Sequence, residues 1–391
     1  MHDVGFVGAG QLARMAGEAA SALGLSLAVL AEREDDSACT VAAEVLVGTP
    51  SKRGDLRALA DRCGVVTFDH EQVDLGLVAE VGTSGAVFRP GTGTLEFAVD
   101  KARMRTGLAA EGIPVPEHVI VDAREDGRAR RDIAEFAAAH GWPLVLKAAR
   151  GGYDGKGVWP VRTLDDVDAV LARHNGVLVA EEHVEMQAEL AVMVARSPSG
   201  ESVAWPPVET AQIDGVCREI LVPGRLTPEV VEQAEDVGRH VADIVGSEGV
   251  LAVELFWTER GLLVNEIAAR PHNSGHWTIE GAVTSQFENH LRAVLDLPLG
   301  LTDPSHAHVA TVNVFGGPEG TDPAPLLGRA LGVPGVHVHL YGKEPRTGRK
   351  LGHVTACGDD PEEVRARAWS AASALDSPIP EGIPVPRRAA R

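Results

Sequence analysis

The 391-residue sequence has few of the residues needed for a disulfide framework, a thiolate metal centre or a membrane span. Its four cysteines lie far apart and form no Cys-x-x-Cys pair, which predicts buried free thiols. No run of about 18 apolar residues occurs. The N-terminus also lacks the basic, apolar and small-residue series of an export signal. These absences predict a cytoplasmic protein that does not enter a membrane.

Basic residues are also scarce. The sequence has 36 Lys and Arg residues against 56 Asp and Glu residues, which gives a formal net charge of −20. This balance argues against nucleic acid as a partner, because a phosphate backbone needs a basic surface. Small phosphorylated ligands need only a few local cations and stay compatible with it. Only six of the basic residues are lysines, and five of those six fall in the motifs described below.

The length predicts two or three domains, because 391 residues exceed one core of ordinary size. Residues 1–95 alternate between strand and helix patterns, which predicts a parallel sheet with helices on its faces. A single helix is expected over 95–111. Short β-rich runs then alternate with helices, and residues 299–391 form a smaller β-rich unit with a Pro-rich tail that frays.

The first motif, GFVGAGQLARM, holds Gly8-x-Gly10-x-x-Ala13 directly after a predicted strand. It resembles the glycine fingerprint of a dinucleotide-binding βαβ unit, and Glu32 stands where such units hold a ribose. An NAD-dependent oxidoreductase is therefore one function that the sequence allows.

A second glycine-rich segment, KAARGGYDGKGVW at 147–159, lies between two predicted strands. It lacks the helix and the Gly-Lys-Ser/Thr ending of a P-loop, so a hairpin is expected. Glycines at its tip let backbone N–H groups close on phosphate oxygens. With Lys147 and Lys156 on either side of Tyr153 and Asp154, the segment favours a nucleotide lid over a flexible turn.

Two glutamates are predicted to face each other across the hairpin VLAVELFWTERGLLVNEIA. A three-residue Glu-Arg-Gly loop sets Thr258 against Leu262, which places Glu254 opposite Glu266, with Cβ atoms roughly 5 Å apart. Two such charges need a cation between them, and hard oxygen ligands suit Mg²⁺ bound to nucleotide phosphates. A solvated pair is the alternative, but the apolar flanks favour metal. Asn265 joins the site only if the backbone twists there.

The next segment, ARPHNSGH, places two histidines four residues apart. Pro271 and the Ser-Gly pair between His272 and His276 indicate a loop rather than a helix, so zinc is not expected. Arg270, His272 and Asn273 suit a small anion, and capping of the following helix is the alternative.

Four cations fall within eight residues of YGKEPRTGRKLGH: Lys343, Arg346, Arg349 and Lys350. In so acidic a chain this cluster predicts a phosphate pocket, with a solvated basic turn as the alternative.

Taken together, GAGQLARM, GGYDGKG, NEIAARPHNSGHWTIEGAVTSQFENHLRAVLDLPL and YGKEPRTGRKLGH resemble the 5-(carboxyamino)imidazole ribonucleotide synthases of de novo purine synthesis. The resemblance covers roughly residues 4–356. It implies an ATP-grasp fold, α/β with α+β parts, with an N-terminal Rossmann-like parallel-sheet domain and a small C-terminal β-rich domain. The expected division is 1–95 for the N-terminal domain, 96–298 for the ATP-grasp domain with its glycine-rich lid, and 299–391 for the C-terminal domain.

The resemblance implies an ATP-dependent carbon–nitrogen ligase. ATP, bicarbonate and 5-aminoimidazole ribonucleotide give ADP, phosphate and the N-carboxylated ribonucleotide through carboxyphosphate. It further implies ATP as co-substrate, Mg²⁺ or Mn²⁺ as the metal, a homodimer, and neither nucleic acid nor membrane as partner.

Site roles are carried over from the resemblance, position by position. ATP binding is expected at Lys101, Lys147, Gly152, Tyr153, Asp154, Gly155, Lys156, Gly157, Val158, Glu181, Glu182, His183, Val184, Glu189, Asn265 and Glu266. Within that set, Glu181 to Val184 form the adenine hinge and Glu189 holds the ribose. Metal binding is expected at Glu254 and Glu266. Catalysis on bicarbonate and the aminoimidazole is expected at Tyr153, Asp154, Arg270, His272 and Asn273. Ribonucleotide binding is expected at Gln11, Leu12, Glu71, Lys343, Arg349 and Lys350.

Some positions depart from the family pattern. Gln212 stands where relatives often have histidine and is left out of the site, and TFDHEQV, around Glu71, differs from the family's more acidic and aromatic version. Within the same fold, a formate-dependent glycinamide ribonucleotide transformylase is the alternative function. From other classes, the alternatives are the NAD-dependent oxidoreductase and a non-catalytic nucleotide-binding module.

Overall fold

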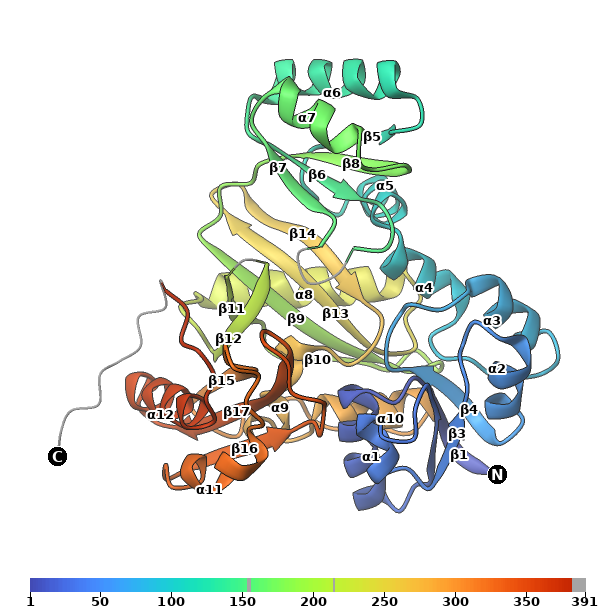
Figure 1. Ribbon diagram of the computed structural model, residues 1–391, viewed down its shortest axis with the longest axis vertical. Coiled ribbons are helices and arrows are strands. Elements are labelled where there is room, and N and C mark those ends of the chain that lie inside the picture. Colours follow the sequence, from blue (N-terminus) through green and yellow to red (C-terminus); the bar gives the residue numbers. More distant parts are fainter. Residues whose placement is uncertain (153–155, 214, 382–391) are drawn as a thin grey trace.

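The computed structural model describes residues 1–152, 156–213 and 215–381, in three parts built around one large sheet (Figure 1). Tyr153, Asp154 and Gly155 of the predicted lid lie outside the described residues, and so do residues 382–391 of the predicted tail. No helix of the described part is long and apolar enough to cross a membrane.

The N-terminal part is a four-stranded parallel sheet of order β3-β2-β1-β4, as its strand–helix alternation predicts. Its elements are β1 (His2–Val7), α1 (Gln11–Leu23), β2 (Leu27–Ala31), η1 (Ser37–Thr40), β3 (Glu44–Val47), α2 (Arg53–Ala60), β4 (Cys63–Phe68), α3 (Leu75–Gly82) and α4 (Thr92–Val99). Strand side chains alternate between two cores: Val4 and Phe6 pack toward α1, and Val7 packs toward α2. The predicted first boundary at residue 95 lies inside α4.

The predicted single helix over 95–111 is wrong, because the chain breaks at Asp100. Asp100 has extended backbone angles and its side chain accepts from the Arg103 N–H at 3.1 Å, so it caps a second helix, α5 (Lys101–Ala110). This break places Lys101 at a helix start that faces the lid.

The lid part, uppermost in Figure 1, is an antiparallel sheet of order β5-β8-β6-β7 covered by two helices. Its elements are β5 (His118–Asp122), α6 (Asp126–His140), β6 (Leu144–Ala148), β7 (Val158–Val161), α7 (Leu164–Leu171) and β8 (Val177–Glu182). The predicted hairpin at 147–159 is confirmed, since Lys147 pairs with Val158 across β6 and β7.

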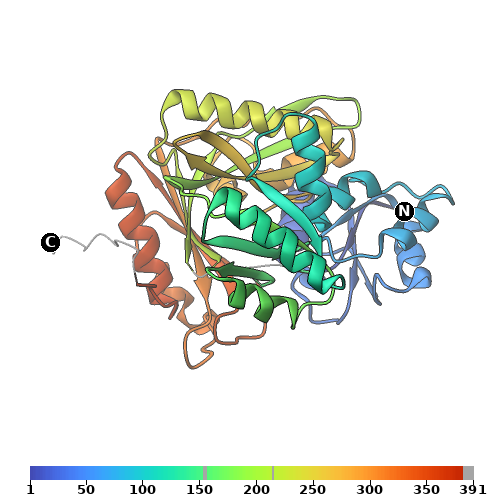
Figure 2. The same cartoon turned by 90° about the horizontal axis from the view of Figure 1, so that it is seen from above.

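The central sheet has nine strands and runs β14-β13-β9-β11-β12-β15-β17-β16, with β10 added beside β9. Its elements are β9 (Ala188–Arg196), β10 (Ser202–Ala204), β11 (Val208–Ile213), β12 (Val216–Val222), α8 (Pro228–Ile244), β13 (Gly249–Thr258), β14 (Gly261–Ala268), η2 (Asn273–Gly275), α9 (Thr278–Gly281), α10 (Gln286–Val294), β15 (His308–Phe315), η3 (Ala324–Leu326), α11 (Leu327–Ala330), β16 (Val336–Leu340), β17 (Lys350–Gly358) and α12 (Pro361–Ala374). The C-terminal strands extend this sheet through the β12–β15 pairing. Seen from above, α8 lies along the top of the view and α12 along its left edge (Figure 2).

His290 joins the N-terminal part to the central sheet. Its ring is fully buried on α10, with Nε2 2.9 Å from the Thr67 hydroxyl of β4, while Nδ1 accepts from the Val250 N–H of β13 at 3.1 Å. Burial lowers the pKa of His290 to about 3. The ring is therefore neutral, and both of its nitrogens are used to hold the two parts together.

The pKa of His290 predicts a pH-dependent stability. The unfolded chain binds a proton near pH 6.5 and the folded chain only near pH 3, so this contribution is complete above pH 6.5 and declines as the pH falls. Between pH 7.5 and 5.5 the loss is about 1.4 kcal/mol. Urea unfolding at both pH values should show a weaker pH dependence, by that amount, in His290→Gln. An equal pH dependence in the wild type and in His290→Gln would contradict the assignment.

Candidate active site

The predicted pairing of Glu254 with Glu266 is confirmed, although the turn differs from the prediction. Thr258 pairs with Gly261 rather than Leu262, so the loop has two residues instead of three. A β-bulge at Asn265 then shifts the register by one residue and restores the pairing of Glu254 with Glu266. The loop is one residue shorter than predicted and the bulge adds one residue to β14, so the two differences cancel in the pairing of the glutamates.

The bulge also supplies the backbone twist that Asn265 needs to enter the site. Its side-chain oxygen accepts from Lys147 Nζ at 2.9 Å, across the gap between the central sheet and the lid. Asn265 and Glu266 therefore both reach the site from adjacent positions, although an ideal strand would point them to opposite faces.

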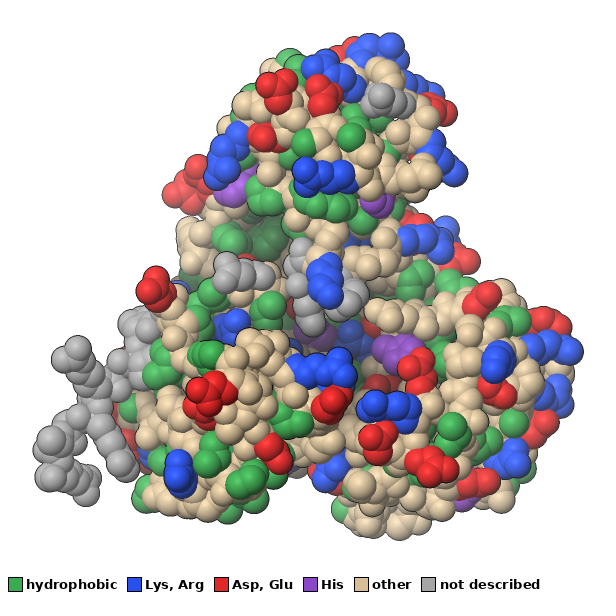
Figure 3. Space-filling model, in the orientation of Figure 1, with side chains coloured by type: hydrophobic (Ala, Val, Ile, Leu, Met, Phe, Trp, Pro, Cys, Tyr) green, Lys and Arg blue, Asp and Glu red, His purple; other side chains and the backbone are tan. Residues whose placement is uncertain are grey.

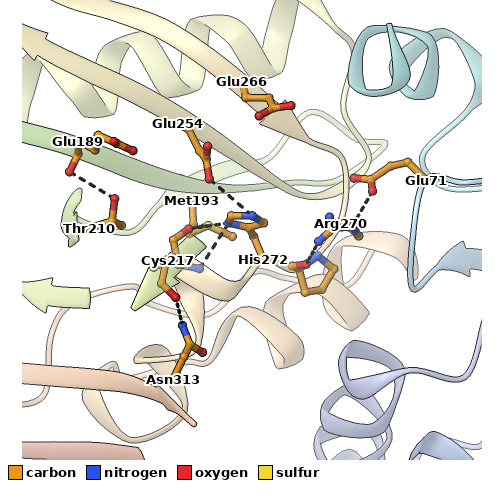
Figure 4. A network of polar contacts seen from close by, with 12 residues as sticks. Glu71, Glu189, Met193, Thr210, Cys217, Glu254, Glu266, Arg270, His272 and Asn313 are labelled. Atoms are coloured by element: carbon orange, nitrogen blue, oxygen red, sulfur yellow. Dashed lines mark hydrogen bonds and ion pairs between the residues drawn. The ribbon is translucent and has the colours of Figure 1, made fainter. Parts of the chain in front are cut away.

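An ammonium group and an imidazole ring lie beside the two glutamates. Lys101 Nζ forms an ion pair with Glu266, and His272 Nε2 lies 3.7 Å from Glu254 Oε1. Figure 4 shows both glutamates on adjacent strands above the His272 ring. Burial raises the pKa of Glu254, although Lys101 and Arg270 act in the opposite direction. Burial and the charge of Lys147 lower the pKa of Lys101 to about 8.

Behind these residues lies a buried ionic network that sequence reasoning missed. The fully buried Arg105 of α5 donates to Glu181 at 2.7 Å and to the Val264 carbonyl at 3.1 Å. Lys147 Nζ lies 2.7 Å from the other Glu181 oxygen. Burial raises the pKa of Glu181, but Arg105 and Lys147 outweigh it and lower the pKa to about 2. Nothing in KARMRTGLAA distinguishes Arg105 from the exposed arginine two residues earlier.

The predicted hinge residues lie at the end of β8 and directly after it. Glu181 directs its side chain into the buried network, and Glu182 accepts from Arg260 of the hairpin turn at 2.7 Å. His183 is exposed and Val184 is half-buried, in the segment that connects β8 to β9. Glu189 lies on β9, where burial and the nearby charge of Glu254 raise its pKa to about 7.

The described ends of the lid lie beside Lys101. The Lys101 N–H donates to the Ala149 carbonyl at 2.8 Å, and a Cβ on Gly152 would lie 4.0 Å from the Lys101 side chain. Gly157 adopts φ +76°, a conformation that favours glycine. Lys156 is exposed, and Val158 begins β7.

The anion loop, residues 269–276, faces the glutamates from below (Figure 4). Arg270 Nε donates to Glu71 at 2.7 Å, and the Ala269 N–H reaches the other Glu71 oxygen at 3.2 Å. Burial, together with the charges of Arg270 and Lys350, lowers the pKa of His272 to about 3. Both polar atoms of the Asn273 amide are buried and find no hydrogen-bond partner among the described residues. Such an unsatisfied amide is available to a ligand.

Of the basic residues predicted to bind the ribonucleotide phosphate, some lie in the site and others at its rim. Lys343 Nζ bonds the Gln11 side chain, which joins the C-terminal part to the start of α1. Lys350 begins β17 close enough to influence Glu254 and His272, whereas Arg349 is held by the Glu344 carbonyl at 3.0 Å. Leu12 buries its side chain in the core, away from any ligand. Lys and Arg side chains and histidines meet where the three parts converge (Figure 3).

A carboxylate of the protein, that of Asp69, occupies the backbone N–H groups of the first glycine motif. Asp69, at the end of β4, accepts from the Gly10 and Ala13 N–H groups, each at 2.8 Å, at the start of α1. A Cβ on Gly10 would overlap that carboxylate. A dinucleotide pyrophosphate binds at this helix position, so Asp69 excludes the NAD-dependent oxidoreductase.

The two facing glutamates fit a divalent ion. Among the described residues, no group of three or more His, Cys, Asp and Glu side chains could enclose a metal. A pair of carboxylates, completed by phosphate and water oxygens, is the arrangement that Mg²⁺ takes with nucleotides. Lys101, paired with Glu266, adds one positive charge beside the two carboxylates.

A glycine lid over a sheet with paired glutamates defines an ATP-grasp enzyme. Residues 106–287 match the model of the ATP-grasp domain, residues 1–98 match the ribonucleotide synthetase preATP-grasp domain, and residues 310–367 match the phosphoribosylaminoimidazole carboxylase C-terminal domain. The chain is 44% identical over 380 residues to the N5-carboxyaminoimidazole ribonucleotide synthase of Mycobacterium tuberculosis, covering 94% of this chain and 86% of that protein. The chain belongs to the N5-carboxyaminoimidazole ribonucleotide synthase family, to which the sequence resemblance pointed.

Solved structures of the same family share the fold. The Thermus thermophilus synthetase is 35% identical, with a TM-score of 0.86, covering 96% of this chain and 99% of that one. The Aspergillus clavatus synthase in complex with ADP and 5-aminoimidazole ribonucleotide is 31% identical, also with a TM-score of 0.86, covering 96% and 98%.

Proposed function

We propose that this chain carboxylates 5-aminoimidazole ribonucleotide with bicarbonate, hydrolysing ATP to ADP and phosphate in purine synthesis. The observation that carries the proposal is the convergence of Glu254, Glu266, Lys101 and Lys147 above an anion loop that offers Arg270 and Asn273. A nucleotide and a small carboxylate-like anion can meet there. Family membership supports the same substrates.

Bicarbonate needs activation, because its negative charge repels an attacking amine. In the proposed reaction a bicarbonate oxygen attacks the γ-phosphorus and ADP leaves. The exocyclic amine then attacks the carbon of carboxyphosphate, or CO₂ released from it in place. Phosphate leaves with that bicarbonate oxygen and takes up the proton that the amine loses. Catalysis thus consists mainly of placement and charge neutralisation.

The residues divide this work. Glu254 and Glu266 would hold Mg²⁺ or Mn²⁺, whose chemistry is to neutralise charge on the transferring phosphoryl group. Lys101, Lys147 and the lid, with Tyr153 and Asp154, bind the ATP phosphates. Arg270, fixed by Glu71, supplies the charge that orients bicarbonate. His272 is neutral, because its pKa is about 3, so it contributes a hydrogen bond.

The remaining assignments complete the proposal. The hinge from Glu181 to Val184 and the ribose contact of Glu189 position the nucleotide. Lys343, Arg349, Lys350 and Gln11 hold the ribonucleotide phosphate where the N-terminal and C-terminal parts meet. A homodimer, a cytoplasmic location and the domain division at 95 and 298 follow from the resemblance and are proposed on that ground.

Phosphate release, measured while each substrate is omitted in turn, tests the proposal. We expect release to require both bicarbonate and 5-aminoimidazole ribonucleotide. Release with formate and without bicarbonate would instead assign the transformylase chemistry, which passes through an acyl phosphate of formate.

A further inference from the structure

The side chain of Gln286 is fully buried at the first position of α10 and bonds to the backbone of the anion loop. Its Oε1 accepts from the His272 N–H at 2.9 Å, and its Nε2 donates to the His272 carbonyl at 2.8 Å. The same nitrogen lies 3.1 Å from Nδ1 of His276. One amide therefore holds both backbone polar groups of His272.

A side-chain amide of this length can make that pair of bonds without gaining or losing a proton. It presents a donor and an acceptor side by side, whereas a carboxylate has no donor and an aliphatic side chain has neither. Gly275 leaves room for it, since a Cβ there would lie 2.5 Å from Gln286 Oε1. The Thr278 hydroxyl accepts from the Gln286 N–H at 2.9 Å and donates to the Gly275 carbonyl at 2.6 Å. The loop and the start of α10 are thus held to each other.

His272, whose backbone Gln286 holds, lies at the centre of the loop that faces Glu254. Arg270 lies two positions before His272 and Asn273 directly after it, so a displaced His272 backbone moves all three side chains. The described ATP residues lie on or next to other elements: α5, β6, β7, β8, β9 and the β13–β14 hairpin. None of the hydrogen bonds described for Gln286 reaches those elements.

We propose that Gln286 is a positioning residue for bicarbonate, and that it acts by fixing the His272 backbone. The inference rests on the proposed function, because it assigns bicarbonate to the anion loop. It predicts that loss of the amide impairs the use of bicarbonate while ATP binding persists.

Gln286→Glu is the direct test, since it keeps the shape and the acceptor but places an oxygen against the His272 carbonyl. We expect kcat/KM for bicarbonate to fall about 10- to 100-fold, as for an unsatisfied buried polar group. The dissociation constant of Mg·ATP, measured by titration calorimetry, should stay within about twofold. Gln233→Glu, on the exposed face of α8, adds the same charge and should change neither value.

Gly275→Ala supplies a second variant, which displaces the amide without adding charge and should cause the same selective loss. It decides the question if thermal unfolding shows that Gln286→Glu is not folded. Folded variants with the wild-type kcat/KM for bicarbonate would overturn the inference, and so would equal losses in bicarbonate use and ATP affinity. If wild-type phosphate release is independent of bicarbonate, the proposed function itself fails, which is a separate and recognisable result.

Discussion

Glu266→Gln is expected to abolish ATP turnover, lowering kcat for phosphate release by about 10³-fold. The substitution keeps the shape of the side chain but removes the charge that pairs with Lys101 and faces Glu254. If these two carboxylates hold Mg²⁺, the neutral amide leaves the transferring phosphoryl group without its counter-charge. Steady-state phosphate release under saturating ATP, bicarbonate and ribonucleotide measures the effect.

Glu259→Gln is the matched control, because Glu259 is exposed at the tip of the same hairpin. Its turnover should stay within about twofold of the wild type. Near-normal phosphate release by Glu266→Gln would refute the metal assignment, and an equal loss in both variants would attribute the effect to the hairpin rather than to the site.

Arg105→Met is expected to destabilise the protein by about 3–5 kcal/mol, the usual effect of breaking a buried ion pair from one side. The guanidinium is fully buried and bonds Glu181 and the Val264 carbonyl. Methionine fills similar space but leaves Glu181 with Lys147 alone. The apparent free energy of unfolding in urea gives the value.

Arg103→Met is the control for that experiment, since Arg103 is exposed one half-turn earlier on α5 and pairs with Glu96 at 3.1 Å. It should cost less than about 1 kcal/mol. If the two variants unfold at the same urea concentration, the network around Glu181 does not contribute about 3–5 kcal/mol to the free energy of unfolding.

Local patterns were predicted well because they depend on neighbours in the sequence. The strand–helix alternation predicted for residues 1–95 is present, with α1 directly after β1, and the lid hairpin pairs as predicted. The opposition of Glu254 and Glu266 was also predicted, but by way of a wrong turn length that the bulge at Asn265 compensates. Strand periodicity carries no signal for a bulge, so its position required the structure.

Contacts between distant elements were not predicted, because they depend on how the parts dock. Arg105 reaches Glu181 across 76 positions and Gln286 reaches His272 from a separate helix, and neither pairing leaves a periodic trace in the sequence. Asp69 is a partial exception. It follows a parallel strand beside the one that leads into Gly8 and Gly10, and the carboxyl ends of such strands meet at one edge.

The central claim is that the γ-phosphoryl group of ATP passes to bicarbonate at this site. Bicarbonate labelled with ¹⁸O tests it most directly, with the isotope content of the released phosphate read by mass spectrometry. The account predicts one labelled oxygen in each phosphate, because the carbon–oxygen bond of carboxyphosphate breaks when the carbon is captured. Unlabelled phosphate, released while the N-carboxylated ribonucleotide accumulates, would contradict it.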